Sequence, residues 1–405
     1  MAVTLANIQE GKIYACRSSL LAQFVSGSLN ETIFSVSVNL KIWNGDIVND
    51  KPSNFTYQLQ VPSSSMPANL FSYELDISEF VSEYVDMDAF NGTYANDSAA
   101  FVEMNWQVLT DDGSGTPSYD DTFTFAVVNG WATYEGNIEM PPFYVPSNLY
   151  MEPNSTYALT VLQRTVVGGT VQASTLDLTY SDGTTDSQSL TTTGTRTADI
   201  FQVAFIDLDD QDYVDVSIGL GPSAFSSYGD YYAYLCDEEN GTGGDVDCAN
   251  ETFGQFFSGP FVQNKVMRIY NKCKPRYTTF KIGYQNRIGV IDYLTCYGTH
   301  SETQNAKREV FRQTVPSGND TSNSQYKVFS ANGRQDFTVN TDFIEEDANE
   351  RIRDILLSKY VFIAGETNEV LIPDDNAQEL IKSENNLINY KLQFKRGYDT
   401  VKSLR

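Results

Sequence analysis

Few residues of this chain have the type and spacing that catalysis needs. Among its 405 residues there is one histidine, His300, so a Ser-His-Asp or Cys-His mechanism would have to use it. Cys296 lies four residues upstream. We expect the two in a strand and the loop after it, where this spacing does not give them a shared helical face. A metal site that needs two or more histidines is excluded.

The other common signatures of chemistry are absent from the sequence. It contains no GxxxxGK[ST] phosphate loop, no GxGxxG between a strand and a helix, and no Cys/His cluster with zinc spacing. Residues 207–212, DLDDQD, resemble part of a calcium loop but lack its glycine and distal glutamate, and we interpret them as a solvated turn. No carboxylate pair is marked out for glycoside hydrolysis. The sequence therefore predicts no enzyme activity and no cofactor.

The charge is distributed unevenly along the chain, whose net charge is −26. Residues 1–264 contain 6 Lys and Arg against 35 Asp and Glu, whereas residues 265–405 contain 21 against 18. The acidic part should repel nucleic acid and anionic surfaces, so we expect no nucleic-acid partner. A plain solvated acidic surface is favoured over a specific cation site.

Two groups of residues are candidates for binding. Residues 268–298 combine the strongest strand signal with a basic cluster interleaved with tyrosines, which could bind single-stranded nucleic acid. We favour docking against another subunit or domain, or a plain solvated face, and predict these docking residues: Lys272, Lys274, Arg276, Tyr277, Lys281, Tyr284 and Arg287. Aromatic residues also gather in one Gly- and Ser-containing segment, where exposed rings could stack on sugars: Phe225, Tyr228, Tyr231, Tyr232 and Tyr234.

Cysteine usage and the N-terminal sequence indicate the cellular compartment. The first 20 residues lack the basic and continuous apolar regions of a signal peptide, so we expect synthesis in a cytoplasm without export by that route. Five cysteines, an odd number, argue against a disulfide framework, and Cys236 and Cys248 are the one pair to test for a bridge. Eight Asn-x-Ser/Thr sequons are interpreted as loop composition. No run of about 18 apolar residues predicts a membrane helix.

The predicted fold class is mainly β, in three domains. Residues 1–140 are predicted to form an Ig-like β-sandwich, because residues 35–42, 102–108 and 123–127 alternate apolar and polar side chains. A short helix capped by Asp76 should interrupt the strands. Residues 141–264 are predicted to form a second β-rich acidic domain. Its strand candidates are residues 157–162 and 175–180, the latter ending in a turn at 181–183, and residues 184–197 are predicted as a loop or an edge.

Residues 265–405 are predicted to form a small α+β docking domain. It opens with a hairpin that turns at residues 286–289, where Gly289 is free to adopt positive φ. The polar segment 299–324 is predicted as a long loop or an arm, because little of it could be buried. A helix capped by Asp342 with Glu345 should follow, then a hairpin around Gly365 and a final strand alternating at Tyr390, Leu392 and Phe394.

Several stretches resemble a known protein family. Residues 273–282, CKPRYTTFKI, and 284–294, YQNRIGVIDYL, are similar to a pattern in tail and other virion proteins of tailed bacteriophages, above all those infecting Bacteroidetes and related marine bacteria. Residues 129–137, NGWATYEGN, and 390–394, YKLQF, also fit the family, whereas residues 141–264 show no specific likeness.

The resemblance implies a non-enzymatic structural component of the virion, made in the bacterial host cytoplasm. It points to a tail or baseplate (tail-tip) protein that forms a ring-like oligomer with copies of itself and contacts other virion proteins. One alternative is a receptor- or carbohydrate-binding tail or surface adhesion module, with the aromatic segment 225–234 contacting a host surface glycan. Another is a secreted glycoprotein carrying sugar on its sequons.

Overall fold

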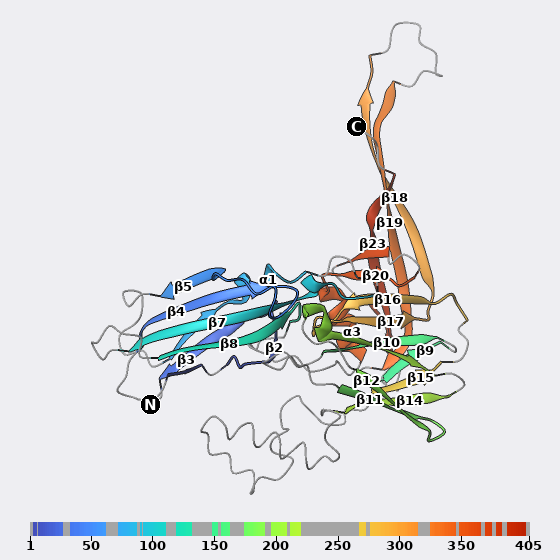
Figure 1. Ribbon diagram of the computed structural model, residues 1–405. Helices are drawn as coiled ribbons and strands as arrows, with labels where there is room; N and C mark the ends of the chain where they lie inside the picture. The colour runs from blue at the N-terminus through green and yellow to red at the C-terminus, as the bar shows by residue number, and fades with distance from the viewer. Residues whose placement is uncertain are drawn as a thin grey trace. The chain divides into compact units, whose positions relative to one another are not determined.

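The protein is mainly β in the computed structural model, which confirms the predicted fold class (Figure 1). The structure describes residues 3–5, 7–26, 33–61, 72–86, 90, 92–110, 119–131, 148–152, 155–162, 174–190, 196–208, 211–219, 267–272, 276–314, 325–345, 348–365, 369–374, 378–382 and 387–401. Within these ranges no helix has the length and apolar character needed to cross a membrane.

The chain divides into two compact units. Unit 1 comprises Met1–Asn271 together with the turn Asn286–Ile291, and unit 2 comprises Lys272–Gln285 together with Asp292–Arg405. The predicted domain boundaries, at 140/141 and 264/265, both lie outside the described residues. The three-part division therefore stays a prediction.

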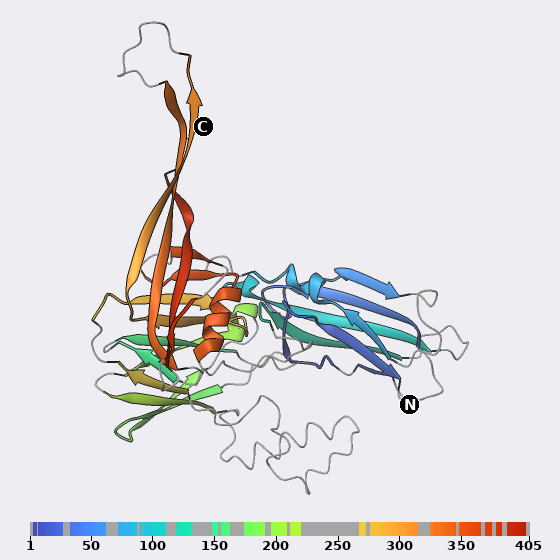
Figure 2. The same ribbon diagram turned by 180° about the vertical axis from the view of Figure 1, so that it is seen from behind.

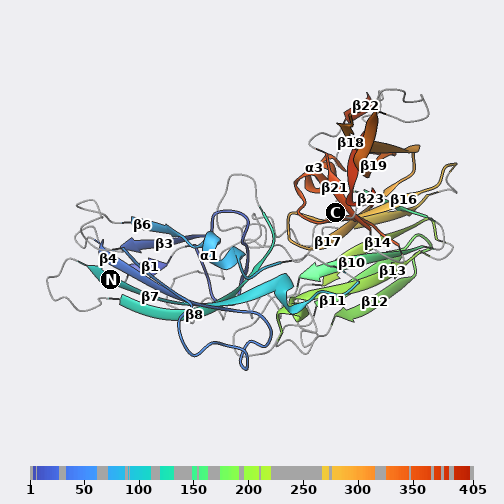
Figure 3. The ribbon, with the colours of Figure 1, turned by 90° about the horizontal axis from the view of Figure 1, so that it is seen from above.

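Unit 1 contains a sandwich of two sheets that share one apolar core (Figure 3). The larger sheet has the order β2-β8-β7-β4-β5, formed by Ile13–Ala15, Tyr119–Val128, Ala99–Thr110, Ile33–Trp43 and Tyr57–Val61. The smaller has the order β1-β3-β6, formed by Val3–Leu5, Leu21–Ser26 and Ser72–Asp76. The predicted alternation is confirmed, because Val36, Val38 and Leu40 all point into this core. The finer Ig-like assignment stays a prediction.

The short helix α1, Ser78–Ser82, lies where the sequence predicts a helix. Asp76 lies two residues before it, and its Oδ1 accepts hydrogen bonds from the backbone N–H groups of Ser78 (2.9 Å) and Leu20 (3.1 Å). Ile77 and Val81 are fully buried in the sandwich core. The N-cap residue of α1 is Ile77, one residue after the predicted cap, and the Asp76 carboxylate holds the start of the helix and the adjacent chain through these two hydrogen bonds.

One end of the larger sheet is buried on its other face as well. A second core cluster combines Ile13, Trp43 and Phe101 from this sheet with residues far along the chain, including Phe201 and Val290. The rings of Tyr94 and Phe201 stack with centroids 4.2 Å apart. Residues of the turn Asn286–Ile291 therefore complete the core of unit 1.

The remaining strands of unit 1 form two further sheets. One has the order β12-β11-β14-β15-β9, formed by Thr185–Leu190, Ser174–Tyr180, Tyr213–Gly219, Met267–Asn271 and Asn148–Met151. The other pairs β10, Thr156–Leu162, with β13, Phe201–Asp207, and two short 3₁₀ turns are η2, Asn96–Ser98, and η3, Thr197–Ile200. The two strands predicted in this region are confirmed as β10 and β11. The predicted turn after β11 is confirmed too, with Gly183 at φ +85°. The predicted loop or edge at 184–197 contains the edge strand β12.

Unit 2 is organised around one sheet, with the order β17-β16-β20-β21-β23-β19-β18 and with β22 also pairing with β23 (Figure 1). In chain order its strands are β16 Phe280–Gln285, β17 Ile291–Cys296, β18 His300–Arg312, β19 Tyr326–Glu345, β20 Val361–Ile363, β21 Glu369–Pro373, β22 Gln378–Lys382 and β23 Leu387–Val401. Helix α3, Asn349–Leu357, packs on this sheet through Ile352 and Ile355, which share a core with Phe337 and Phe394 (Figure 2). The predicted hairpin around Gly365 and the final strand are confirmed.

The predicted helix cap at Asp342 is wrong. Asp342 lies within β19 at φ +65°, and α3 begins seven residues later, at Asn349. Thr341 is buried; its hydroxyl donates to the carbonyl of Asp342 (2.8 Å) and accepts the N–H of Tyr390 (3.0 Å). This irregularity lets β19 keep pairing with β23 as far as Glu345. The same Asp-x-x-Glu spacing thus occurs in a bulged strand rather than at a helix start.

The polar segment 299–324 was predicted to be a long loop or an arm, and it contains an arm. Every residue of β18 is exposed, and β18 pairs with β19 along its whole length. In Figure 1 the β18–β19 hairpin extends beyond the other strands of the sheet.

Candidate interaction surface

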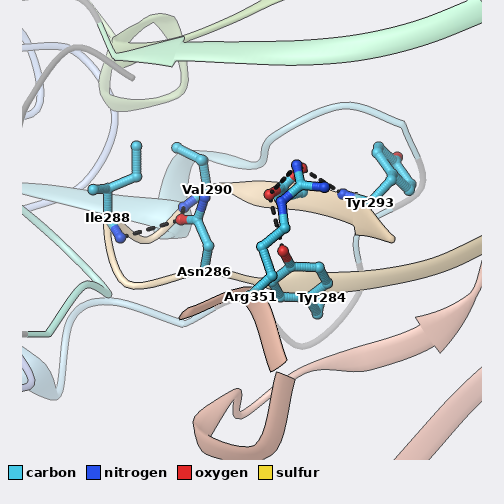
Figure 4. Close-up of polar contacts among 7 residues, drawn as sticks. Tyr284, Asn286, Ile288, Val290, Tyr293 and Arg351 are labelled. Atoms are coloured by element: carbon cyan, nitrogen blue, oxygen red, sulfur yellow. Dashed lines mark hydrogen bonds and ion pairs between the residues drawn. The ribbon is translucent and has the colours of Figure 1, made fainter. Parts of the chain in front are cut away.

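A buried ion pair fixes the strands that carry the predicted docking residues. Asp292 of β17 accepts hydrogen bonds from the hydroxyl of Tyr284 (2.9 Å) and from the backbone N–H of Tyr293 (2.7 Å) (Figure 4). The Nη2 atom of Arg351, on α3, lies 3.2 Å from Oδ2 of the same carboxylate. Both charged side chains are at least nine-tenths buried. The network therefore connects β16, β17 and α3 inside unit 2.

Tyr284 is wrongly predicted as a docking residue, because it is fully buried. Its ring packs in the core of unit 2, and its hydroxyl donates a hydrogen bond to Asp292. The sequence could not distinguish this role, since a tyrosine among basic residues fits an exposed aromatic surface equally well.

The turn between β16 and β17 forms as predicted. The side-chain Oδ1 of Asn286 accepts the N–H groups of Ile288 (3.1 Å) and Val290 (3.3 Å), and Gly289 adopts φ +82° (Figure 4). Within unit 1 the turn is held by two further hydrogen bonds, from the N–H of Ile291 to the hydroxyl of Tyr94 (2.8 Å) and from the N–H of Trp131 to the carbonyl of Arg287 (2.7 Å).

Two of the predicted docking lysines make internal contacts. Lys272 pairs with Asp342 (3.2 Å) and lies over the ring of Tyr297 (4.1 Å). Lys281 lies over the ring of Tyr293 (4.4 Å). Burial lowers the pKa of Lys281, against an opposing effect of the Asp292 charge. These cation–π contacts stabilise unit 2 and leave less of each ammonium group for a partner.

The other predicted binding residues have different surroundings. Arg276 and Tyr277 are exposed, and the guanidinium of Arg276 lies 5.6 Å from the ring centroid of Tyr277. Arg287 is half-buried in unit 1. Lys274 lies outside the described residues, as do the five predicted ligand-exposed aromatics, Phe225, Tyr228, Tyr231, Tyr232 and Tyr234. The proposed Cys236–Cys248 bridge also lies outside them.

The sequence did not reveal an exposed group of apolar side chains that lies on the arm. We define the distal ribbon as residues 307–312 of β18 and 326–332 of β19, which among the described strands pair only with each other. It carries five exposed apolar or aromatic side chains, with exposed fractions of 58% for Val310, 46% for Phe311, 58% for Tyr326, 56% for Val328 and 67% for Phe329. Such a concentration makes the distal ribbon a candidate interaction site.

The register of the distal ribbon brings these side chains together. Val310 faces Val328 and Arg312 faces Tyr326 on one side, while Phe311 faces Lys327 on the other. Phe329 is the extra residue of a β-bulge between the Val310 and Glu309 pairs. Bulges re-aim side chains and often occur at functional positions. The distal ribbon thus presents apolar groups on both of its faces.

The base of the arm is held by an arginine network. Arg396 of β23 pairs with Glu302 of β18 (2.7 Å) and with Glu369 of β21 (2.6 Å). Hydrogen bonds to Tyr398 and Glu369 raise the pKa of Arg396 against the effect of burial. Asn305 also donates to Asp336 across the hairpin. Side-chain contacts with β23 and β21 therefore hold the base of the arm.

The Cys296–His300 pair has none of the geometry of an activated thiol. Cys296 is fully buried, and burial raises the pKa of its thiol to about 12, the opposite of the shift that activates a nucleophile. His300 is exposed at the start of β18, with its ring against Phe280 (centroids 4.7 Å apart).

We expect Cys296 to resist alkylation in the native protein. At pH 8 its thiol is protonated and covered, so iodoacetamide should label it only when urea unfolds the chain, as peptide mass spectrometry would show. A Ser301→Cys variant, with the thiol on the exposed strand β18, provides the matched control and should be labelled under native conditions. Rapid native labelling of Cys296 would contradict its burial.

Among the residues that the structure describes, no group of three or more His, Cys, Asp or Glu side chains is arranged to hold a metal ion. No protein-family model matches the chain, and no curated protein matches it at a significant level.

Proposed function

We propose that this chain is a structural, non-enzymatic subunit of a tailed-phage virion, a tail or baseplate protein that assembles into a ring-like oligomer through its arm. The class comes from the sequence resemblance at residues 273–294. The observation that carries the assembly role is the distal ribbon, which holds five exposed apolar or aromatic side chains away from the core of unit 2.

The distal ribbon lacks sufficient stabilisation within one chain. A two-stranded ribbon is at best marginally stable in water, and three or more strands or a packed face are usually needed. Burying a large apolar side chain contributes about 1.5–3 kcal/mol relative to leaving it exposed. A partner that covers the distal ribbon would supply this contribution, whereas a solitary chain leaves these side chains in water.

Removing apolar side chains from the distal ribbon is expected to abolish assembly without unfolding the protein. In the test variant Phe311, Val328 and Phe329 are each replaced by serine, and native mass spectrometry with negative-stain microscopy records the oligomer. We expect a ring-like oligomer for the wild type and monomers for the variant. The thermal midpoint should stay close to the wild-type value, because these side chains lie outside the core.

A matched control removes exposed apolar side chains elsewhere in the same sheet. Val370 and Ile372 of β21 are 41% and 45% exposed, and replacing both by serine should leave the oligomer intact. If the wild-type protein stays monomeric at high concentration, and no virion protein binds it, the proposed function is wrong.

A further inference from the structure

We propose that the distal ribbon docks on the acidic β11–β12 hairpin of a second copy of this chain, joining copies head to tail. This inference rests on the proposed function and names the partner surface. It rests on the charges and the exposed side chains of two surfaces, one in each unit.

The distal ribbon is basic as well as apolar. It contains four cations, Lys307, Arg308, Arg312 and Lys327, against the single carboxylate of Glu309. Within the described part of the chain no ion pair neutralises Lys307, Arg308 or Lys327. A surface that combines apolar groups with unpaired cations favours an acidic partner that also offers apolar contact.

The β11–β12 hairpin has the complementary character. Asp177, Asp182 and Asp186 are exposed on β11, on the connecting turn and on β12. Hydrogen bonds from the side chain and backbone of Thr184 lower the pKa of Asp182 and keep its carboxylate charged. The hairpin, residues 174–190, contains no Lys or Arg.

An exposed aromatic side chain lies on β13, a strand that contacts β12. Phe205 of β13 is 60% exposed, and its carbonyl accepts a hydrogen bond from the side chain of Gln188 on β12 (3.4 Å). Its ring offers the apolar contact that the valines and phenylalanines of the distal ribbon require. Among the strands that the structure describes, β12 is also the edge strand of its sheet, a position at which another strand can add to a sheet.

Charge determines which surface the distal ribbon selects. Two distal ribbons facing each other would bring eight cations together, which opposes a symmetric arm-to-arm contact. Contact between two different surfaces, repeated from copy to copy, closes into a ring when the rotation allows. The same complementarity therefore accounts for a ring without a second type of subunit.

Charge reversal on each surface tests the pairing. One variant carries Lys307→Glu, Arg308→Glu and Lys327→Glu, and the other carries Asp177→Lys and Asp186→Lys. We expect each variant alone to weaken self-association by about 100-fold or more, and a chain with both sets to recover to within about 10-fold of the wild type, by analytical ultracentrifugation. Raising the NaCl concentration should weaken wild-type association. Arg353→Glu, on the exposed face of α3, is the control and should have no effect.

The outcomes separate this inference from the proposed function. Recovery in the doubly reversed chain supports the pairing. If the oligomer persists in both single-surface variants, or if combining the reversals fails to restore it, the pairing is overturned while the proposed function stands. A wild-type protein that never associates overturns both. Circular dichroism melts of every variant exclude unfolding as the cause of a lost oligomer.

Cross-linking between tagged copies provides an independent readout. Copies with Val328→Cys are mixed with differently tagged copies with Ser187→Cys, and oxidation should give a disulfide that joins the two tags. A control mixture with Leu357→Cys, exposed on α3, in place of Val328→Cys should not cross-link. If both cysteines are placed in one chain and cross-links form within that chain alone, the contact is intramolecular and the inference is wrong.

Discussion

Replacing Arg351 by alanine is expected to lower the free energy of unfolding by about 3–5 kcal/mol. The substitution leaves the carboxylate of Asp292 buried without its cation, although the hydroxyl of Tyr284 still donates to it. Removing one partner of a buried ion pair is costly because the remaining charge keeps its desolvation penalty. Urea denaturation followed by far-ultraviolet circular dichroism would measure the change.

The control for this prediction comes from the same helix. Arg353 lies two residues away on α3 and is exposed, so Arg353→Ala should change the free energy of unfolding by no more than about 0.5 kcal/mol. Equal effects of the two substitutions would show that the ion pair contributes no more than a surface arginine does.

Replacing Gly289 by alanine should destabilise the protein by about 2–5 kcal/mol. The residue has φ +82°, where an L-residue costs roughly 1–2 kcal/mol. A Cβ atom there would also meet the backbone of Asn129 and Gly130 at 3.1 Å, and crowding against fixed backbone adds about 1–3 kcal/mol. Thermal and urea unfolding would show a lower midpoint.

Gly183 distinguishes the cost of positive φ from the cost of crowding against nearby backbone. Its φ of +85° is nearly the same, but no atom lies within 4 Å of where its Cβ would be. Gly183→Ala should therefore cost only the backbone contribution. If the two alanine variants were equally stable, the close approach of the turn to residues 129–130 would have no energetic consequence.

The parts of the fold that follow local rules could be predicted from the sequence. Alternation of apolar and polar side chains identified the strand around Val36–Leu40, and a turn signal placed Gly289 at positive φ. Both patterns depend on neighbours within a few residues. The predicted cap at Asp342 was wrong because a distant interaction decides the structure there. Pairing with β23, about 50 residues later, overrides the local capping signal.

The candidate interaction surface could not be predicted from the sequence because it depends on the register of β18 with β19. Val310 and Phe311 form one short apolar run, and Val328 and Phe329 form another, in otherwise polar sequence. Only the pairing of β18 with β19 brings the runs together, and only the lack of a third described strand leaves them exposed. The docking role of the basic cluster stays a prediction, and what the sequence did not reveal is that Lys272 and Lys281 contact tyrosine rings of their own unit.

The placement of the turn Asn286–Ile291 has a consequence for synthesis. A chain leaves the ribosome N-terminus first, and its domains usually fold in that order. Here Ile288 and Val290 belong to the same core cluster as Ile13 and Trp43. The packing of Ile13 and Trp43 is therefore complete only after Val290 has been translated, and some apolar surface stays uncovered on the nascent chain until then.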